Sequence, residues 1–270
     1  MSPEAPLGVF DSGLGGLTVV RELRRALPHE DILYLGDTAR VPYGTKGPET
    51  VTRYALACAR HLVGRGAKAI VVACNTVSAV APDRLRAELD VPILSVIEPG
   101  ARAAVEASRT GRIGILATAG TIASGAYPRA VTSRSTRAET YGQAAPLLVP
   151  LAEEGWTEGE VPELVAARYL EPLARAGVDV IVLGCTHYPL LRATLEKVAA
   201  RAMGDGVVLV DSARATAEDA VAFLRERGML RSPGRPGTTH LFVTDLPASF
   251  EAGVRRFLGS GFDSVTAVDL

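Results

Sequence analysis

Two cysteines are the residues of this sequence whose type and position best suit chemistry. Cys74 and Cys185 each end an apolar, strand-like run, and polar residues follow them, Asn75-Thr76 and Thr186-His187 respectively. In open α/β sheets, ligands bind beyond the carboxyl ends of the strands. A thiol titrates near ~8.5, so one of two such groups can be a thiolate while the other keeps its proton. The pair therefore indicates proton-transfer chemistry, whereas a single cysteine would be typical of a protein core.

A glycine-rich turn supplies a second candidate. The segment Asp11-Ser12-Gly13-Leu14-Gly15-Gly16 follows an apolar run and precedes a helical pattern. Glycines permit a tight turn, and the amides of a helix N-terminus favour an anion. The segment lacks the Lys-Ser/Thr of a phosphate-binding loop and the spacing of a dinucleotide-binding loop, so a carboxylate fits as well as a phosphate. The alternative is a simple turn in which Asp11 caps the helix.

Other polar residues at strand ends or in loops are weaker signals. They are Asp37, Pro42-Tyr43-Gly44, Thr118, Thr121 and Glu153. His187 is either a hydrogen-bonded structural imidazole or a group that tunes the proton affinity of the neighbouring thiol. Glu153 precedes Gly155 closely and fits a solvated loop equally well. Cys58 lies in a helical pattern and is expected in the core.

The elements that must position these residues alternate along the chain. Apolar runs predict strands at 8–10, 32–35, 69–73, 93–97, 112–117, 147–151, 180–183 and 207–210. Helical patterns occupy 17–27, 50–62 and 82–89, and further helices are expected after Cys74 and near Pro189. This alternation predicts an α/β fold with mainly parallel sheets and crossover helices.

The chain also resembles itself when one half is laid on the other. One fixed offset aligns a helix, a glycine turn, a strand and a cysteine; the aligned pairs are Leu62 and Leu173, Gly66 and Gly177, Ile70 and Ile181, and Cys74 and Cys185. A second offset aligns Gly8-Val9-Phe10 with Gly114-Ile115-Leu116. All βαβ units look alike to some degree, but the coincident cysteine favours two similar α/β domains.

Length and composition narrow the classes of protein. At ~150 residues per domain, 270 residues favour two domains. With 29 basic against 30 acidic residues there is no basic excess to neutralise nucleic acid, so a small molecule is the expected partner. Apolar runs fall short of the ~18 residues of a membrane span, and a signal-peptide pattern is missing, so we expect a cytoplasmic protein. The three cysteines predict neither a disulfide framework nor a metal site.

Five segments resemble those of the bacterial glutamate racemases, in the aspartate/glutamate racemase superfamily. They are FDSGLGGLTV (10–19), VPYG (41–44), ACNTVSA (73–79), VPLAEEG (149–155) and GCTHYPLL (184–191). The resemblance covers nearly the whole chain in order. It implies a cofactor-independent isomerase that interconverts L- and D-glutamate and supplies D-glutamate for peptidoglycan, and hence for cell wall and cell shape. It also implies a possible homodimer.

The resemblance further implies a fold and a set of site residues. Two Rossmann-like domains, 1–98 with 211–270 and 99–210, are expected to be related by a pseudo-twofold axis, with the active site in the cleft between them. The implied catalytic residues are Cys74, Cys185, Asp11, Glu153 and His187. The implied substrate-binding residues are Asp11, Ser12, Pro42, Tyr43, Gly44, Asn75, Thr76, Thr118, Thr121, Thr186 and His187. By the same resemblance, Cys185 should deprotonate L-glutamate and Cys74 should deprotonate D-glutamate.

Three alternatives remain open at this point. A pyridoxal phosphate enzyme would need a Schiff-base lysine, and Lys46, Lys68 and Lys197 all lie in unsuitable contexts. An aspartate racemase would use the same chemistry on another side chain, but His187 favours glutamate. A non-catalytic protein that binds acidic ligands, with structural cysteines, would keep its function when either thiol is lost.

Overall fold

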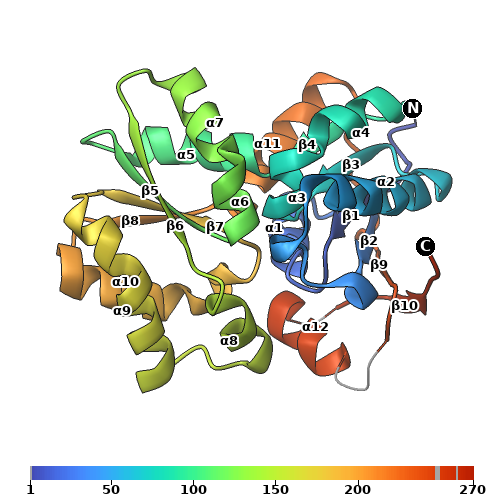
Figure 1. The fold of residues 1–270 in the computed structure, drawn as a ribbon. Coiled ribbons are helices and arrows are strands. Elements are labelled where there is room, and N and C mark those ends of the chain that lie inside the picture. The colour runs from blue at the N-terminus through green and yellow to red at the C-terminus, as the bar shows by residue number, and fades with distance from the viewer. Residues whose placement is uncertain (1, 247–249, 260) are drawn as a thin grey trace. The chain divides into compact units, whose positions relative to one another are not determined.

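The computed structural model describes residues 2–246, 250–259 and 261–270, and the chain divides into two compact units (Figure 1). Met1–Val96 and Ala213–Leu270 form the first unit, and Ile97–Ser212 form the second. Each unit is built around its own parallel β-sheet. Within the parts of the chain that the structure describes, every helix is too short or too polar to cross a bilayer.

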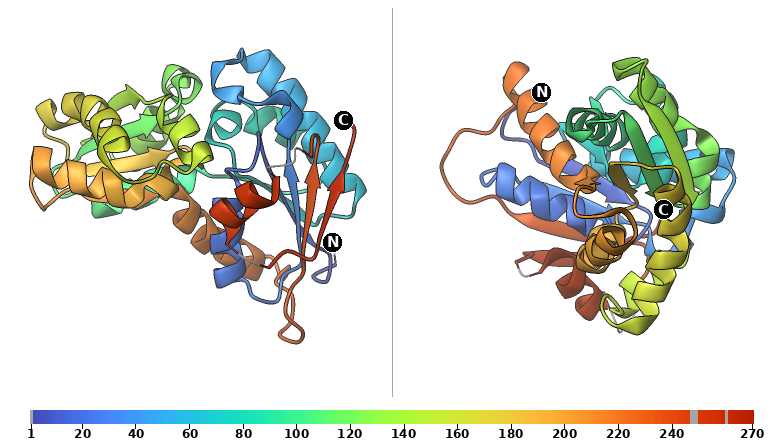
Figure 2. Two further views of the ribbon diagram at one scale, coloured as in Figure 1. Left: turned by 90° about the horizontal axis from the view of Figure 1, so that it is seen from below. Right: turned by 90° about the vertical axis from the view of Figure 1, so that its left-hand side faces the viewer.

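The sheet of the first unit has the order β10-β9-β2-β1-β3-β4, and neighbouring strands run parallel. The strands are β1 (Leu7–Asp11), β2 (Ile32–Gly36), β3 (Ala69–Val72), β4 (Ile93–Ser95), β9 (Thr239–Val243) and β10 (Ser264–Ala267). Strands β1, β2 and β3 are buried along their whole length, as expected for a parallel sheet covered on both faces. The C-terminal segment returns to this sheet, since β9 pairs with β2 (Figure 2).

Helices connect the strands of the first unit. They are α1 (Leu17–Ala26), α2 (Pro48–Gly64), α3 (Asn75–Val80), α4 (Pro82–Glu88), α11 (Ser212–Glu226) and α12 (Phe250–Leu258), with short 3-10 helices η1 (Thr38–Arg40) and η2 (Tyr43–Thr45). Helix α2 starts with Pro48, whose missing N–H is harmless in a first turn. The chain leaves α2 through Gly66, at φ 86°, a left-handed conformation that favours glycine. One face of α2 packs on the core around Cys58 and Leu62.

The second unit has a smaller sheet with the order β6-β5-β7-β8, again parallel. Its strands are β5 (Arg112–Ala117), β6 (Glu139–Ala144), β7 (Val180–Gly184) and β8 (Val208–Asp211). Its helices are α5 (Ile97–Ala107), α6 (Ala119–Ser124), α7 (Ala126–Arg134), α8 (Leu148–Glu154), α9 (Glu160–Arg175), α10 (Arg192–Met203) and the 3-10 helix η3 (Tyr188–Leu191). Helix α9 ends before Gly177, which has a positive φ of 64°.

The two sheets share one four-stranded plan, which matches the internal repeat of the sequence. The order β2-β1-β3-β4 in the first unit corresponds to β6-β5-β7-β8 in the second. The register agrees as well, since Gly8 pairs with Ile70 on β3 and Gly114 pairs with Ile181 on β7. Both alignment offsets therefore describe one structural repeat, to which the first unit adds β9 and β10. The predicted α/β class with parallel sheets is confirmed.

One predicted strand is wrong. The apolar run Leu147–Leu151 lies mostly in helix α8, and the strand of this region is β6 at Glu139–Ala144. A short apolar run fits a helix and a strand equally well. Strand β6 is an edge strand whose residues are at most half-buried, so its sequence is polar and lacks the expected apolar pattern. Similarly, the predicted helix near Pro189 begins as the 3-10 turn η3, and α10 follows only at Arg192.

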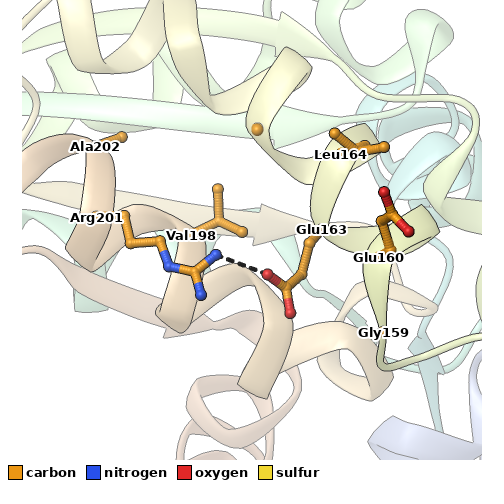
Figure 3. A pocket seen from close by; sticks show the side chains of 8 residues that line it. Gly159, Glu160, Glu163, Leu164, Val198, Arg201 and Ala202 are labelled. Carbon is orange, nitrogen blue, oxygen red and sulfur yellow. Dashed lines mark hydrogen bonds and ion pairs between the residues drawn. The ribbon is translucent and has the colours of Figure 1, made fainter.

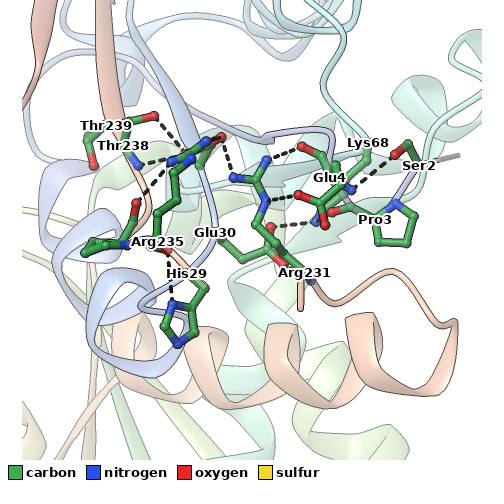
Figure 4. Close-up of polar contacts among 12 residues, drawn as sticks. Ser2, Pro3, Glu4, His29, Glu30, Lys68, Arg231, Arg235, Thr238 and Thr239 are labelled. Carbon is green, nitrogen blue, oxygen red and sulfur yellow. Dashed lines mark hydrogen bonds and ion pairs between the residues drawn. The ribbon is translucent and has the colours of Figure 1, made fainter. Parts of the chain in front are cut away.

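A buried ion pair and its hydrogen bonds join four segments of the first unit (Figure 4). Lys68 Nζ lies 2.5 Å from Glu30 Oε2 and also donates to the carbonyl of Pro3 at 2.7 Å. The other oxygen of Glu30 accepts a hydrogen bond from the Arg231 backbone amide at 2.7 Å. The pair thereby ties together the N-terminal segment, the residues just before β2 and β3, and the returning C-terminal segment.

Candidate active site

Cys74 lies just beyond the carboxyl end of β3, a central strand of the first unit. It is the N-cap residue of α3, and its carbonyl accepts the first helical hydrogen bond from Ser78 N at 2.8 Å. The side chain is largely buried, with 6% of the residue exposed. Its Sγ lies 3.7 Å from the hydroxyl of Ser12, within hydrogen-bond range for sulfur. The thiol of Cys74 and the glycine turn therefore meet, because β1 and β3 are neighbouring strands.

The glycine turn is held by Asp11, the last residue of β1. Asp11 is fully buried, and its Oδ2 accepts a hydrogen bond from Gly13 N at 3.0 Å. Glycine is needed at position 16, because an added Cβ would lie 2.5 Å from Asp11 Cβ and 3.1 Å from Ala73 Cβ. Asp11 thus shapes the turn that carries Ser12, and it does not cap α1, whose N-cap is Gly16.

The Pro42-Tyr43-Gly44 segment follows β2 and enters the same region through η2, which contacts α3. The Tyr43 ring is buried in the core, and its hydroxyl donates to Asp37. Burial raises the pKa of Tyr43, so the phenol stays protonated. Asp37 is fully buried and also accepts from Arg40 Nε at 2.9 Å and Thr244 Oγ1 at 2.8 Å. Because the Tyr43 hydroxyl is already hydrogen-bonded to Asp37, we expect the backbone of this segment to meet a ligand.

In the second unit, Cys185 heads a chain of three groups. It follows β7 directly and is 7% exposed. Cys185 Sγ lies 3.7 Å from Nδ1 of His187, and the Nε2 of His187 lies 3.0 Å from Glu153 Oε1. His187 is buried whereas the Glu153 side chain, at the end of α8, is 50% exposed. The imidazole can therefore pass the influence of a solvated carboxylate to a buried thiol.

Three threonines lie at or just beyond the strand ends next to Cys185. Thr186 Oγ1 lies 3.4 Å from His187 Nδ1. Thr118, the N-cap of α6, accepts from the Thr121 amide, and their hydroxyls are 3.0 Å apart. Strands β5 and β7 are paired up to Ala117 and Gly184, so Thr118 and Cys185 begin at adjacent strand ends. Hydroxyls and helix N-terminal amides at one strand edge suit a small polar or anionic ligand.

Each unit thus gathers its own share of the predicted residues at the carboxyl edge of its sheet. The first unit holds Asp11, Ser12, Pro42, Tyr43, Gly44, Cys74, Asn75 and Thr76, and the second holds Thr118, Thr121, Glu153, Cys185, Thr186 and His187. Asn75 and Thr76 are buried in the first turn of α3. Glu153 ends a helix and so does not lie in a solvated loop.

Cys58 has the structural role that its helical pattern predicted. It is fully buried on α2 within the first unit's core, and burial raises the pKa of its thiol. The three cysteines, all of which the structure describes, form no disulfide. Among the described residues, no group of three or more His, Cys, Asp or Glu side chains is arranged to hold a metal ion.

A surface hollow of about 580 Å³ lies away from these residues, on α9 and α10 of the second unit (Figure 3). Its lining residues are Gly159, Glu160, Glu163, Leu164, Ala167, Val198, Arg201 and Ala202. Glu163 is paired with Lys197 and Arg201, so its charge is already compensated. The hollow contains none of the predicted site residues and offers no nucleophile.

Two residues that support the site were not among the predicted site residues. The sequence marks Asp37 only as a polar residue after a strand, although it accepts hydrogen bonds that anchor the Tyr43 segment. Tyr34 was missed altogether, because a tyrosine inside an apolar run looks like core. Its hydroxyl donates to the carbonyl of Gly13 at 2.6 Å. The contact joins β2 to the turn that follows β1, so no local sequence signal predicts it.

Comparison with known proteins adds the family. The Asp/Glu/Hydantoin racemase family model matches residues 11–220. A glutamate racemase of Geobacter metallireducens is 51% identical over 268 residues, covering 99% of this chain and 98% of the relative. The crystal structure of the Francisella tularensis glutamate racemase in complex with D-glutamate superimposes with a TM-score of 0.91 at 35% identity, covering 99% of this chain and 98% of that one. The Thermus thermophilus glutamate racemase, in complex with beta-chloro-D-alanine, gives 0.88 at 44% identity, over 100% and 99% of the two chains.

Proposed function

The chain belongs to the Asp/Glu/Hydantoin racemase family, and from this premise we infer that it is a glutamate racemase that interconverts L- and D-glutamate. The D-enantiomer serves peptidoglycan synthesis. The observation that carries the mechanism is the pair of thiols at the carboxyl ends of β3 and β7, equivalent strands of the repeat. Inverting an α-carbon removes a proton from one face and returns one to the other, and two thiols supply one acid–base group for each face.

Cys185 removes the α-proton of L-glutamate, and Cys74 delivers a proton to the opposite face; the reverse reaction exchanges the roles. In each direction the carbon–hydrogen bond electrons remain on the α-carbon and its carboxylate until the second thiol donates. The α-proton beside an ionised carboxylate is a weak acid, so the carbanionic transition state needs preorganised donors. Backbone amides that follow the two cysteines, with the hydroxyls of Ser12, Thr76 and Thr186, supply them.

The supporting residues differ between the two thiols. His187 lies between Cys185 and Glu153, so it orients the thiol and exchanges protons with it. On the other side, Asp11 shapes the turn that holds Ser12 against Cys74. Pro42, Gly44, Asn75, Thr118 and Thr121 complete the proposed substrate contacts.

The reaction is proposed to proceed without a cofactor, and the lysines support this. A Schiff base to pyridoxal phosphate needs an accessible lysine near the reacting atoms. Lys68 directly precedes β3, at the strand end opposite Cys74, and it is held in a buried ion pair with Glu30. Lys197 lies on α10 in an ion pair with Glu163, and Lys46 donates to the Pro42 carbonyl from an exposed position.

A circular-dichroism assay of the purified protein tests the activity. We expect interconversion of L- and D-glutamate without added cofactor and in the presence of a chelator. Aspartate should react far more slowly, since it lacks one methylene of the side chain. Racemisation of aspartate at the glutamate rate would favour the aspartate racemase alternative, and binding of glutamate without turnover would favour a non-catalytic protein.

A deuterium experiment tests the two-thiol mechanism. When L-glutamate reacts in deuterated water, Cys185 removes protium while a deuterated Cys74 delivers deuterium. Early D-product should carry solvent deuterium, and the remaining L-substrate should stay mostly unlabelled. Cys74→Ser and Cys185→Ser should each nearly abolish racemisation in both directions, because serine is a far weaker acid. Early D-product that keeps its protium would show that one base serves both faces.

We also propose the organisation of the working enzyme. The domains 1–98 with 211–270 and 99–210 each contribute one thiol. The protein acts in the cytoplasm, where D-glutamate is used, and its proposed state is a homodimer. Leu147, Trp156 and Leu164 are large apolar side chains of the second unit, and at 55%, 57% and 63% exposed they are available for a subunit contact. Sedimentation velocity should give a dimer mass, and a monomer at working concentration would contradict this.

A further inference from the structure

Tyr34 is a fully buried side chain that the proposed chemistry does not use. It lies on β2, and none of its surface is exposed. Its hydroxyl donates to the Gly13 carbonyl at 2.6 Å. Gly13 belongs to the turn between β1 and α1. One hydroxyl therefore ties β2 to the middle of the glycine turn.

The same turn carries Ser12 to the thiol of Cys74. Asp11 holds Gly13 through its amide at 3.0 Å, and Tyr34 holds Gly13 through its carbonyl. Ser12 immediately precedes Gly13, and its hydroxyl lies 3.7 Å from Cys74 Sγ. A shift of Gly13 would therefore move Ser12 relative to the thiol.

Close packing makes the turn sensitive to this hydroxyl. A Cβ added at Gly36 would overlap the Gly13 carbonyl oxygen, so the turn rests directly on the end of β2. On its other side, a Cβ at Gly16 would press on Ala73, the residue before Cys74. Interiors packed this closely transmit small displacements to their neighbours.

The hydroxyl of Tyr34 remains a donor at all relevant pH values. Burial raises the pKa of Tyr34 well above its usual value, and the nearby Asp11 and Cys74 raise it further. The phenol therefore stays neutral over the pH range in which free cysteine thiols ionise. Its hydrogen bond to Gly13 does not switch with the protonation state of Cys74.

The described residues of the second unit place no tyrosine at the equivalent position. Tyr34 pairs with Val9, the repeat counterpart of Val9 is Ile115, and Ile115 pairs with Gly142. A Cβ at Gly142 would lie 3.3 Å from Ile122, so an aromatic ring has no room there. The hydrogen bond from Tyr34 to Gly13 therefore occurs only in the Cys74 half of the repeat, among the described residues. In the other half, Cys185 instead has the imidazole of His187 beside it.

We propose that Tyr34 is a positioning residue for Cys74: its hydroxyl holds the glycine turn so that the Ser12 hydroxyl stays within hydrogen-bond range of the Cys74 thiol. The role in turnover rests on the proposed racemase function. The role in holding Ser12 against Cys74 does not, and it can be measured on the thiols themselves.

Site-specific alkylation tests the proposal without turnover. Wild type and Tyr34→Phe are treated with iodoacetamide across a pH series, and the modification of each cysteine is followed by peptide mass spectrometry. We expect the alkylation rate of Cys74 at a given pH to change by about threefold or more, as for loss of a hydrogen bond of ~1 kcal/mol. Cys185 should keep its wild-type profile and serves as the internal reference. Equal changes at both cysteines, or no change at Cys74, would overturn the proposal.

Two further variants separate positioning from general damage. Tyr127→Phe removes the hydroxyl of another fully buried tyrosine, in the second unit, and should leave the Cys74 profile unchanged. In a Ser12→Ala background, Tyr34→Phe should have little additional effect on Cys74, because the two act through one contact. Additive effects would contradict that route. Replacing Tyr34 by 4-aminophenylalanine keeps a donor at the same ring position and should restore the Cys74 profile, including when the Phe variant folds poorly.

Kinetics then test the consequence for racemisation. Tyr34→Phe should lower kcat by about 10- to 100-fold, as for a displaced catalytic group. The isotope effect of α-deuterium on kcat/KM should grow for D-glutamate, whose proton Cys74 removes, and shrink for L-glutamate. A purely structural role would lower the active fraction and leave both isotope effects unchanged. If the wild type does not racemise glutamate, the proposed function fails while the alkylation result still decides the Tyr34 role.

Discussion

The two thiols have chemically different neighbours, although the strands that carry them are equivalent. Cys185 Sγ has an imidazole within 3.7 Å, and that imidazole reaches a carboxylate at 3.0 Å. Cys74 Sγ has the hydroxyl of Ser12 at 3.7 Å. A histidine can store and return a proton near neutral pH, whereas a hydroxyl can only orient the thiol. The two halves of the proposed reaction should therefore respond differently to substitution.

His187→Ala should lower kcat by about 100-fold with the fold intact, because it removes the group that exchanges protons with Cys185. Glu153→Ala should cost less, about tenfold, because it acts through His187 and is half-exposed. Steady-state kinetics in both directions measure this. Glu154→Ala is the matched control, an exposed neighbour on α8 that should keep wild-type turnover. Equal losses for Glu153→Ala and Glu154→Ala would remove Glu153 from the site.

At the scale of elements, glycines decide how closely helices approach the central strands. Gly8 on β1 and Gly114 on β5 are equivalent in the repeat. A Cβ at Gly8 would lie 2.7 Å from Ile70 Cδ1 and 3.0 Å from Ala67 Cβ, while one at Gly114 would lie 3.1 Å from Leu173 Cδ1. Strand β1 ends at Asp11 and β5 ends directly before Thr118, so the packing of the glycines also determines where the polar residues emerge.

Gly8→Ala should lower the free energy of unfolding by about 1–3 kcal/mol, since the methyl group overpacks a closed core. Urea unfolding followed by circular dichroism measures the change. Gly64→Ala, on the last turn of α2 with open space around it, should be neutral or stabilising by about 0.5–1 kcal/mol. If Gly8→Ala were as harmless as Gly64→Ala, close packing would not explain this glycine.

At the scale of the whole molecule, charged side chains at the end of the sheet opposite Cys74 connect distant parts of the chain. Glu30, Lys68 and Arg231 lie in three segments that only the fold brings together (Figure 4). The contact holds β2 and the C-terminal return in place, and β2 in turn carries Tyr34 and Gly36 to the glycine turn. Stability at this end of the sheet therefore supports geometry at the other.

Glu30→Gln should lower the free energy of unfolding by about 3–5 kcal/mol, because it leaves the buried Lys68 ammonium without its counter-charge. Denaturant titration provides the measurement. The double variant Glu30→Leu/Lys68→Met should be much more stable than Glu30→Gln, because it leaves no unpaired charge in the core. Glu106→Gln breaks an exposed pair with Arg102 and should change stability by about 0–1 kcal/mol. A loss for Glu30→Gln within that small range would contradict the burial argument.

Asp31 gives the same region a pH dependence. Burial raises the pKa of Asp31, but hydrogen bonds from Arg235, Thr238 and Arg231 outweigh it, and the net pKa lies well below the usual value. A carboxylate with a lowered native pKa stabilises the fold above its unfolded pKa of ~3.9, and this stabilisation is lost as pH falls through the native pKa.

The stability difference between wild type and Asp31→Asn should therefore be largest above about pH 4 and shrink on acidification. Urea unfolding at a series of pH values measures it. Asp90→Asn, an exposed aspartate, should show a small difference that hardly varies. A difference for Asp31→Asn that grows toward low pH would have the wrong sign and would refute the assignment.

Much of this protein could be predicted from the sequence alone. The central strands, the glycine turns and the two strand-end cysteines follow from local pattern, because a parallel α/β sheet needs buried apolar runs and tight turns at its edge. The duplicated plan appeared in the alignment of the chain with itself, and the family in five short motifs. The confirmed fold class and family rest on these local signals.

The tertiary structure decided what depends on residues far apart in the chain. The polar edge strand β6 is recognisable only by its pairing with β5, and the apolar run beside it forms α8. Asp37 meets Thr244, and Tyr34 meets Gly13, only because β9, β2 and β1 lie side by side. Such contacts leave no periodic trace in a sequence, since they are fixed by strand order and register, and those are properties of the whole sheet.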